Sequence, residues 1–290
     1  MELIKLDAQN RQNAELRASF NALTRKVFGF DFEFWFRNGC WGDDYLPYSL
    51  VENGAVLANV SVNRMNLLWN GKKYRAVQLG TVMTDPEWRG KGLLRRVMEE
   101  VLAQWRGKAD FIYLFANDTV LDFYPKFGFQ RLTEHQCIVK PQQFSRGGEI
   151  RRLDPARPED EKILRRLAEN HVPVSPVLSM EKNANLQLFY GLGFLRGGLY
   201  YWPERDMLAV LDDDGGSRTI ADLLCSREFD TAEAISAFAG EESETTLGFS
   251  PDPSCGLPVR YVPLGDDDSL FMMPAQGDFT KAMFPVLSHA

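Results

Sequence analysis

The stretch TVMTDPEWRGKGLLRRVMEEVLAQW, which runs from Thr81 to Trp105, decides the fold. Its middle four residues, RGKG, place two glycines and two cations directly in front of a run of apolar residues that share one helical face. Because the first N–H groups of a helix have no partner inside it, they attract an anion together with the helix dipole. The stretch therefore predicts a helix that begins at an anion-binding loop. The apolar face of this helix consists of Leu93, Leu94, Val97, Met98, Val101, Leu102 and Trp105.

The RGKG residues also fit a simpler interpretation, a surface turn that carries solvated charges before a helix. In an anion site, Gly90 and Gly92 let the backbone approach a ligand closely, and Arg89 and Lys91 add charge-assisted hydrogen bonds. The surroundings favour the anion site, since the loop follows an expected strand that ends at GTVMT, residues 80–84.

Two Asn-Gly pairs upstream of this loop predict an antiparallel meander. Asn53-Gly54 and Asn70-Gly71 are each flanked by β-prone residues, and Asn-Gly supplies the positive backbone angles of a tight hairpin turn. Before the meander, a helix is predicted from an apolar stripe at three- and four-residue steps. That stripe consists of Leu16, Phe20, Leu23 and Val27.

Downstream of the loop, DFIYLFAN (residues 110–117) is nearly all apolar, which predicts a strand buried on both faces. DTVLDFYPKFGF (118–129) predicts a short helix that Asp118 caps and that Pro125 and Gly128 end. The second half repeats this outline of strands, a helix and strands, but it has no counterpart of RGKG. A Pro-, Gly- and charge-rich segment between the halves predicts a boundary near residues 145–149.

Length and composition predict a globular protein of two domains. The chain has 290 residues, of which 44% are hydrophobic and 25% charged, and no apolar run has membrane-spanning length. The N-terminus lacks the apolar centre of a signal peptide, so we expect a cytoplasmic protein with no membrane partner. The net charge of -7 disfavours nucleic acid as a partner. The cysteines and histidines have no ligand spacing, which predicts reduced thiols and no metal site.

Two sequence motifs, and their order along the chain, resemble those of the GNAT superfamily of acyl-CoA-dependent N-acyltransferases. The pyrophosphate loop of that family, commonly written Q/R-x-x-G-x-G/A, matches Arg89, Gly92 and then Leu94, where Leu94 replaces the usual small residue. The second motif, an Asn seven residues before a Tyr that a GF turn follows, matches Asn117 and Tyr124. The resemblance covers about residues 1–140, and the remainder resembles a degenerate module of the same kind.

The resemblance implies an α/β (α+β) fold with two domains. Residues 1–145 would form the GNAT domain, a mixed sheet flanked by helices in which two parallel central strands splay apart. Residues 146–290 would form a smaller, degenerate GNAT-like domain without the pyrophosphate loop.

The resemblance also implies acetyl-CoA as the co-substrate and assigns the residues that hold it. The strand end would pair with the pantetheine arm, the loop would bind the diphosphate, and Asn117 would contact the coenzyme. An ordinary buried strand end and a capping Asn are the alternatives. The implied cofactor-binding residues are Val82, Met83, Thr84, Arg89, Gly90, Lys91, Gly92, Leu93, Leu94 and Asn117.

For the chemistry, the resemblance implies direct transfer of an acetyl or longer acyl group to a primary amine of a small molecule. Tyr124 matches the tyrosine that commonly acts as general acid, and a phenol with an ordinary pKa near 10 is protonated at neutral pH. A purely packing role for Tyr124 is the alternative. The acceptor pocket would be shaped by the loop NGCWGDDYLPY (38–48), whose acids beside aromatic rings would attract a cationic amine, unless they form a solvated acidic turn. The implied substrate-binding residues are Trp41, Asp43, Asp44 and Tyr45.

No general base stands out in the sequence. Many relatives use a Glu on the strand before the loop, but Gln78 stands there, and an amide cannot act as a base. In some two-domain relatives the C-terminal carboxylate enters the cleft, which adds Ala290. The other candidates are Glu33, Asp43, Asp44, Asp85, Glu87 and Glu134. The sequence also leaves open a non-catalytic acyl-CoA-binding regulatory module, an aminoacyl-transferring cousin, and the choice between a monomer and a homo-oligomer.

Overall fold

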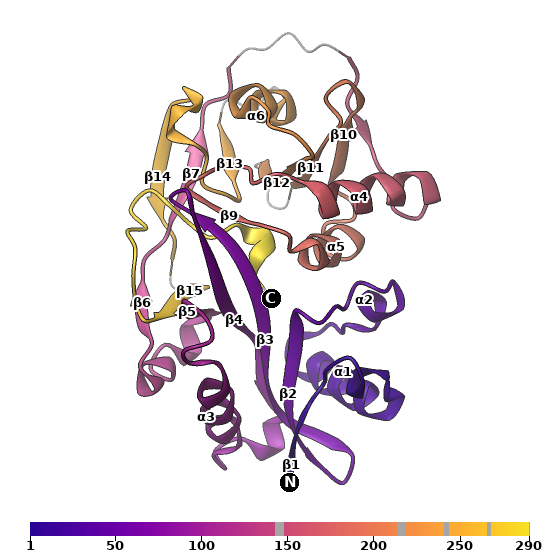
Figure 1. The fold of residues 1–290 in the computed structure, drawn as a ribbon, viewed down its shortest axis with the longest axis vertical. Helices are drawn as coiled ribbons and strands as arrows, with labels where there is room; N and C mark the ends of the chain where they lie inside the picture. The colour runs from indigo at the N-terminus through magenta and orange to yellow at the C-terminus, as the bar shows by residue number, and fades with distance from the viewer. Residues whose placement is uncertain (143–147, 214–217, 241–243, 266–267, 290) are drawn as a thin grey trace.

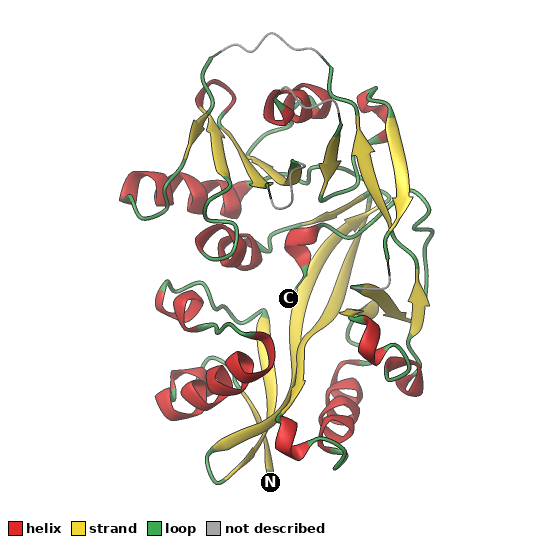
Figure 2. Ribbon diagram, turned by 180° about the vertical axis from the view of Figure 1, so that it is seen from behind, coloured by secondary structure: helices red, strands yellow, loops and turns green. Residues whose placement is uncertain are grey.

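The computed structural model describes residues 1–142, 148–213, 218–240, 244–265 and 268–289. They form two mixed β-sheets with helices packed against both (Figures 1 and 2). Within these residues, no helix combines the length and the apolarity needed to cross a membrane. The predicted fold class, mixed sheets of parallel and antiparallel strands flanked by helices, is confirmed.

The first sheet has eight strands in the order β1-β2-β3-β4-β5-β15-β6, and β9 pairs with the far end of β3. Strands β4 and β5 are parallel, and they are the central pair. The strand bounds are β1 Glu2–Lys5, β2 Tyr45–Glu52, β3 Ala55–Trp69, β4 Lys72–Thr84, β5 Phe111–Ala116, β6 Gln130–Leu132, β9 Leu178–Met180 and β15 Ser269–Met273.

The two predicted hairpins are confirmed, and they join β2 to β3 and β3 to β4. Asn53 and Gly54 have φ values of 52° and 80°, and Asn70 and Gly71 have 48° and 73°. Positive φ at both central residues is the geometry of a type I′ turn, which Asn-Gly adopts readily. These local signals therefore fix the meander that carries the site.

Helices cover both faces of the first sheet. On one face lie α1 (Ala14–Phe28), which Asn13 caps, and the short α2 (Glu33–Arg37). On the opposite face lies α3 (Leu93–Trp105), whose predicted apolar stripe packs on β2, β3 and β4 (Figure 1). The segment after β5 departs from the sequence prediction. It forms only 3-10 turns, η3 (Asp118–Val120) and η4 (Tyr124–Phe127), and Asn117 rather than Asp118 caps the first of them.

The second sheet has seven strands in the order β14-β7-β13-β12-β11-β10-β8. From β10 to β13 it repeats the first sheet, with three antiparallel strands, a helix (α6) and a parallel strand. The bounds are β7 His135–Val139, β8 Arg151–Arg152, β10 Leu199–Trp202, β11 Met207–Asp212, β12 Thr219–Cys225, β13 Thr245–Leu247, β14 Val259–Pro263, α4 Pro158–Asn170, α5 Ala184–Leu192 and α6 Thr231–Ala239.

The two sheets exchange a strand with each other. Strand β15, near the end of the chain, lies in the first sheet between β5 and β6, and its register runs from Ser269 opposite Ala116 to Met273 opposite Ile112. Strand β7, from the first half of the chain, lies in the second sheet between β13 and β14. The predicted domain boundary between residues 145 and 146 falls outside the described residues, and the sheets draw strands from both sides of it.

A continuous apolar core joins the two halves on the α1 face of the first sheet. It contains residues of α1 and α2 together with residues of α4 and α5. Phe32 stacks on Phe189 of α5 with ring centroids 5.5 Å apart, and Trp35 Nε1 donates to the carbonyl of Asn185 at 2.9 Å. The second half of the chain therefore packs directly against the helices that border the site.

Candidate active site

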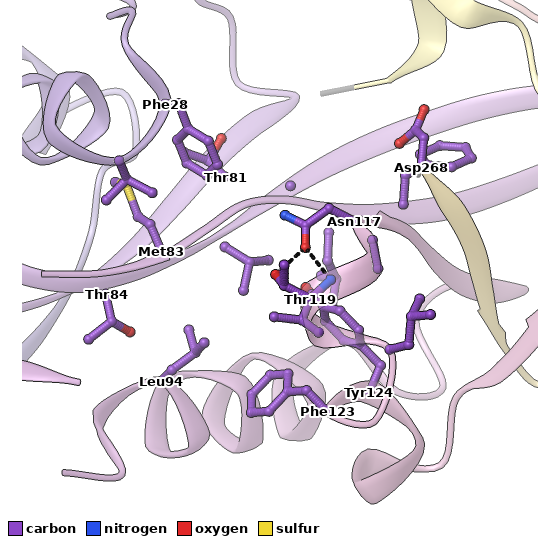
Figure 3. Close-up of a pocket in the computed structure, with 18 of the residues that line it drawn as sticks. Phe28, Thr81, Met83, Thr84, Leu94, Asn117, Thr119, Phe123, Tyr124 and Asp268 are labelled. Carbon is purple, nitrogen blue, oxygen red and sulfur yellow. Dashed lines mark hydrogen bonds between the residues drawn. The ribbon is translucent and has the colours of Figure 1, made fainter. Parts of the chain in front are cut away.

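A cavity of about 1330 Å³ opens where β4 and β5 part (Figure 3). Its walls are the end of β4, the start of α3, the end of β5 with the turns that follow, and α5 from the second half. Thr84, Leu94 and Tyr124 come from the first three of these elements, and they surround the space in Figure 3. The cavity thus unites the two motifs of the first half with a wall from the second.

The parting of the two strands begins after Leu79. Leu79 pairs with Leu114, which is the last pair of the parallel ladder. On the other side of β4 the register slips, because Ser61 of β3 pairs with Gly80 while Asn59 pairs with Met83. Two residues of β4 therefore face one residue of β3. Such a bulge bends its strand, and here it turns the end of β4 away from β5.

Thr81 occupies the bulge with a φ of 46°, which is a rare backbone conformation for a β-branched residue. Two buried contacts hold it there. Its hydroxyl is hydrogen-bonded to the Tyr45 hydroxyl, and its carbonyl accepts from Asn59 Nδ2 at 2.9 Å. Backbone strain of about 1–3 kcal/mol persists only where the surroundings enforce it, and it is common at functional sites.

The stretch after the bulge offers polar groups to the cavity. Val82, Met83 and Thr84 all line it, and the described ladder to β5 has already ended there. The Oγ1 of Thr84 is buried and has no hydrogen-bond partner among the described residues. A buried polar atom of this kind usually finds a partner in water or in a ligand.

Helix α3 begins at the cavity with no side-chain cap. Gly92, at its N-cap position, has a φ of 76° and leaves the first N–H groups of the helix open. The corresponding helix of the second sheet, α6, is capped by Asp230, whose carboxylate accepts from the N–H of Glu233 at 3.0 Å. The start of α3 therefore suits an anion from outside the chain, whereas the start of α6 is already occupied by the Asp230 carboxylate. The loop residues that line the cavity are Arg89, Gly90, Gly92, Leu93 and Leu94.

Lys91 is the loop residue that lies outside the described lining. Its ammonium sits 4.1 Å from the ring centroid of Trp88, a cation–π contact.

Tyr124 and Asn117 both line the cavity across from α3. Tyr124 is 4% exposed, and burial raises its pKa to about 12, so the phenol is protonated throughout the neutral range. Its ring contacts those of Phe123 and Phe271, which belong to the packing. The Oδ1 of Asn117 accepts from the N–H of Thr119 at 3.1 Å (Figure 3). This bond makes Asn117 the cap of the turn and orients its amide group.

The four residues predicted to bind the acceptor lie elsewhere among the described residues. Trp41 and Tyr45 are buried in the core, at 4% and 1% exposure. Asp43 pairs with Arg11 at 2.7 Å, and Asp44 pairs with Arg64. None of the four is among the described residues that line the cavity, and their contact with a substrate stays a prediction.

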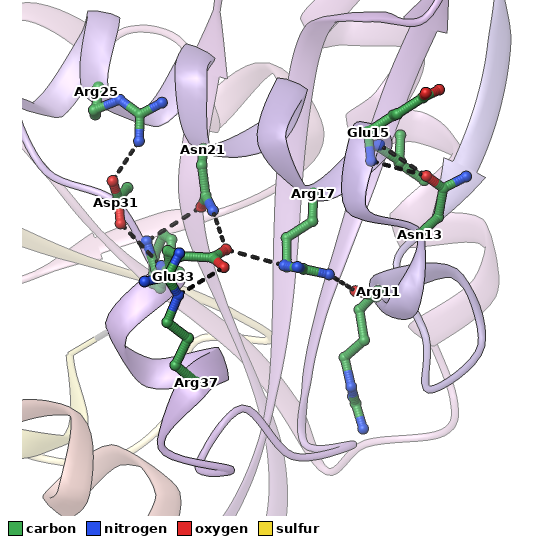
Figure 4. Close-up of polar contacts among 11 residues, drawn as sticks. Arg11, Asn13, Glu15, Arg17, Asn21, Arg25, Asp31, Glu33 and Arg37 are labelled. Carbon is green, nitrogen blue, oxygen red and sulfur yellow. Dashed lines mark hydrogen bonds and ion pairs between the residues drawn. The ribbon is translucent and has the colours of Figure 1, made fainter.

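Other acids proposed as the base are engaged in ion pairs. Asp85 is 2.8 Å from Lys26, which lowers the pKa of that carboxyl, and Glu87 is 3.7 Å from the same ammonium. Glu33 accepts hydrogen bonds from Arg17 at 3.0 Å and from Arg37 at 3.2 Å (Figure 4).

The remaining candidates differ in where they lie. Gln78 does line the cavity, but an amide is no base. Glu134 is 3% exposed and lies outside the described lining. Ala290 lies outside the described residues.

The burial of Glu134 leads to a prediction about the pH dependence of protein stability. Burial, together with the nearby charge of Asp268, raises its pKa from 4.5 to about 8, although it accepts from the Phe284 N–H at 2.6 Å. Between pH 4.5 and 8 the unfolded chain ionises this carboxyl while the folded chain keeps it protonated. We therefore expect the free energy of unfolding to fall as pH rises through that window, by on the order of 3–5 kcal/mol.

Urea unfolding of Glu134→Gln at pH 5 and pH 8 measures this effect. The variant should match the wild type at pH 5 and exceed it at pH 8, since glutamine keeps the acceptor and never ionises. Glu33→Gln is the opposite control, because the hydrogen bond from Arg17 lowers the pKa of Glu33 and its loss destabilises near neutral pH. Equal slopes for the wild type and Glu134→Gln would contradict the prediction.

No sequence motif pointed to several of the residues that line the cavity. An aromatic wall comes from the end of α1 and the segment after it, and from α5 and the residues that follow it; one further corner carries an acid and a histidine. These side chains are separated by up to about nine-tenths of the chain, so no local motif links them. They are Phe28, Phe30, Phe32, Phe189, Tyr190, Phe194, Asp268 and His289.

Comparison with known proteins bears on the family and the fold of the chain. A family model described as "Acetyltransferase (GNAT) domain" matches residues 10–132. No curated protein matches the chain. Among solved structures, a conserved protein of unknown function from Enterococcus faecalis V583 is similar over 93% of this chain and 71% of its own, with 17% identity and a TM-score of 0.58.

Two further solved structures are similar over 93% of this chain. Eis1 from Mycobacterium abscessus has 15% identity and a TM-score of 0.58, and the match covers 73% of its chain. A GCN5-related N-acetyltransferase from Kribbella flavida has 17% identity and a TM-score of 0.53 over 71% of its chain. At these identities the likeness concerns the fold of both halves. The part of the chain that the family model identifies as similar to a GNAT acetyltransferase domain is residues 10–132.

Proposed function

We propose that the chain is an acetyl-CoA-dependent N-acetyltransferase that transfers the acetyl group directly to a primary amine of a small molecule. The observation that carries the proposal is the joint position of an uncapped helix start, a splayed strand pair and a buried tyrosine on one cavity. The family of residues 10–132 supports the reaction class.

In this proposal the coenzyme enters along β4 and α3. Its diphosphate accepts hydrogen bonds from the first N–H groups of α3, and Arg89 adds charge at the same place. The pantetheine arm extends the sheet beside residues 82–84, where the ladder to β5 has ended. Asn117 faces the arm from the end of β5. The thioester then lies in the gap between the two strands.

Two groups of the chain assist the transfer. A backbone N–H of residues 82–84 stabilises the negative charge that grows on the thioester oxygen during attack. Tyr124 donates its proton to the departing thiolate, and its raised pKa keeps that proton available over the whole neutral range. The aromatic wall excludes water from the amine and offers ring faces to its apolar body.

Release of the coenzyme A thiol from acetyl-CoA in the presence of amines tests the proposal. The panel contains 2-phenylethylamine and tyramine, which suit the aromatic wall, and spermidine and kanamycin as polar contrasts. Acetylated amine, identified by mass, is the expected product. No turnover with any donor and amine, despite tight coenzyme binding, would overturn the proposal.

Tyr124→Phe is expected to lower kcat by about 100- to 1000-fold and to leave the affinity for acetyl-CoA within a factor of two. The substitution removes the proton donor but keeps the ring and its packing. The measurements are steady-state kinetics and calorimetric titration with acetyl-CoA. Tyr261→Phe, in β14 of the second sheet, is the matched control and should change neither. An equal loss of kcat and affinity in Tyr124→Phe would instead indicate a packing role.

A second candidate function is a non-catalytic module that binds acyl-CoA. The observation that favours it is the amide of Gln78 in the cavity wall, at the position where many relatives carry a carboxylate base. Calorimetric binding of acetyl-CoA without transfer to any amine would support this function.

A further inference from the structure

His289 and Asp268 form a pair at one corner of the cavity. Asp268 directly precedes β15, and His289 directly follows η7 (Val286–Ser288). The Nδ1 of His289 is 2.9 Å from the Oδ2 of Asp268, and both residues line the cavity. Figure 3 shows Asp268 well separated from Leu94, so the pair and the start of α3 lie at different ends of the cavity.

The pair is held next to the point where the strands part. The imidazole of His289 stacks on the ring of Phe115, with centroids 3.6 Å apart and planes 15° from parallel. Phe115 directly follows Leu114, the last residue of β5 that pairs with β4. From α5, the hydroxyl of Tyr190 donates to the carbonyl of His289 at 2.8 Å. The imidazole therefore lies over the strand that borders the gap.

The hydrogen bonds of the pair define the role of each ring nitrogen. When Nδ1 donates its proton to Asp268, the other nitrogen, Nε2, carries a lone pair. Nε2 is buried and has no hydrogen-bond partner among the described residues. Burial raises the pKa of Asp268, but the hydrogen bond from His289 and the charge of its ring together outweigh it and hold that pKa below the ordinary value. A carboxylate that orients an imidazole is the arrangement that prepares a nitrogen to accept a proton.

We propose that His289 is the general base of the acetyl transfer and that Asp268 is the positioning residue that holds it. The inference rests on the proposed function above. The cavity wall also carries the carboxylates of Asp118 and Asp122, but both of these residues are exposed, whereas the Nε2 of His289 is buried.

The proton and electron balance is complete with these groups. Nε2 takes one proton from the substrate ammonium, which leaves a neutral amine and an imidazolium. The amine lone pair forms the C–N bond to the thioester carbon, and the C–S bond then breaks with its electron pair on sulfur. The thiolate takes the Tyr124 proton, and the resulting phenolate takes the second proton from the new amide nitrogen. The imidazolium finally releases its proton to water.

The effect of His289 on a pH profile must be distinguished from that of the other titratable groups near the imidazole. Asp268 and Tyr190 contact His289 directly, from β15 and α5. Glu134, on the connection between β6 and β7, interacts with Asp268. Because Glu134 could add its own inflection to a pH profile, Glu134→Gln is the control, and it should keep the acid limb of the wild type.

The test compares His289→Gln, Asp268→Asn and the wild type with the fastest amine of the panel between pH 6 and pH 10. His289→Gln should lower kcat/KM for the amine about 100- to 1000-fold and keep the affinity for acetyl-CoA within twofold. Its acid limb should move to the pKa of the amine itself, because the rate then follows only the fraction of free amine. Asp268→Asn should lower kcat/KM for the amine about 10-fold, because the imidazole is no longer held in its orientation. Added imidazole should restore part of the activity of His289→Ala.

Each outcome decides the assignment. A His289→Gln enzyme with the wild-type rate and acid limb overturns it and leaves the proposed function intact. Equal losses of rate and coenzyme affinity, with no rescue by imidazole, overturn it in favour of a structural role. If the wild type binds acetyl-CoA but acetylates no amine, the proposed function and this assignment fall together. Circular dichroism and thermal unfolding of each variant show whether it folds, and Asp268→Asn still tests the pair if His289→Gln does not.

Discussion

Residues 1–142 expressed alone are expected to yield no stably folded protein. Without β15, the inner edge of β5 is left unpaired and β6 loses the strand that holds it in the sheet. Leu270, Phe271 and Met272 of β15 are at most 1% exposed, and each buried apolar side chain contributes about 1.5–3 kcal/mol. Their combined loss is comparable with the whole stability of a typical domain, about 5–15 kcal/mol.

Circular dichroism, size-exclusion chromatography and acetyl-CoA titration of the fragment measure this result. Coexpression with residues 148–290 is the matched control, and the two fragments should copurify because each supplies a strand of the other's sheet. A monomeric fragment 1–142 with a cooperative unfolding transition and acetyl-CoA binding would show that β15 is dispensable.

Gly92→Asp is expected to weaken acetyl-CoA binding by about 100-fold or more. At this N-cap position the new carboxylate would accept hydrogen bonds from the first N–H groups of α3 and take the place of the diphosphate. The loss of two charge-assisted hydrogen bonds at about 1.5–3 kcal/mol each gives that magnitude, since 1.4 kcal/mol corresponds to tenfold. Isothermal titration with acetyl-CoA measures the affinity.

Gly71→Asp separates this effect from backbone strain. Gly71 has a φ of 73°, close to the 76° of Gly92, and neither glycine has an atom within 4 Å of where a Cβ would stand. Gly71 belongs to the hairpin between β3 and β4 and lies outside the described cavity lining. Its variant should lose similar stability and keep the wild-type affinity. Similar affinities for the two variants would refute an anion site at the start of α3.

The elements that could be predicted from the sequence are those whose structure is determined by residues close together in the chain. The hairpins need positive φ at two neighbouring residues, and Asn-Gly supplies it at residues 53–54 and 70–71. Helix α3 needs an apolar stripe at helical spacing, which starts at Leu93. The loop in front of that helix lines the cavity because its glycines and the helix start are consecutive in the chain.

The strand exchange could not be predicted in the same way. The segment 269–273 has the composition of a strand, but its partner β5 lies more than 100 residues earlier in the chain. Strand pattern alone does not specify a partner, and the similar outlines of the two halves offer two equivalent places for the strand. The Asp268–His289 pair escaped notice for the same reason, since the exchange brings both residues to the cavity.

The aromatic loop 38–48 shows a second limit of sequence reasoning. Acids beside Trp41 and Tyr45 are consistent with a pocket for a cation, yet both rings are buried and both acids are paired with arginines. Composition does not distinguish an aromatic pocket wall from an aromatic core. Tyr45 still bears on the cavity, because its hydroxyl holds the strained Thr81.

The exchanged strands also affect how the protein is made. During translation β6 leaves the ribosome long before β15, so the nascent first half carries an unpaired strand edge on β5 until β15 emerges. Exposed strand edges of this kind promote aggregation and engage chaperones. A translation product that stops before β15 would therefore lack the cavity as well as this strand, and coenzyme uptake by the nascent polypeptide would have to wait until β15 has been synthesised.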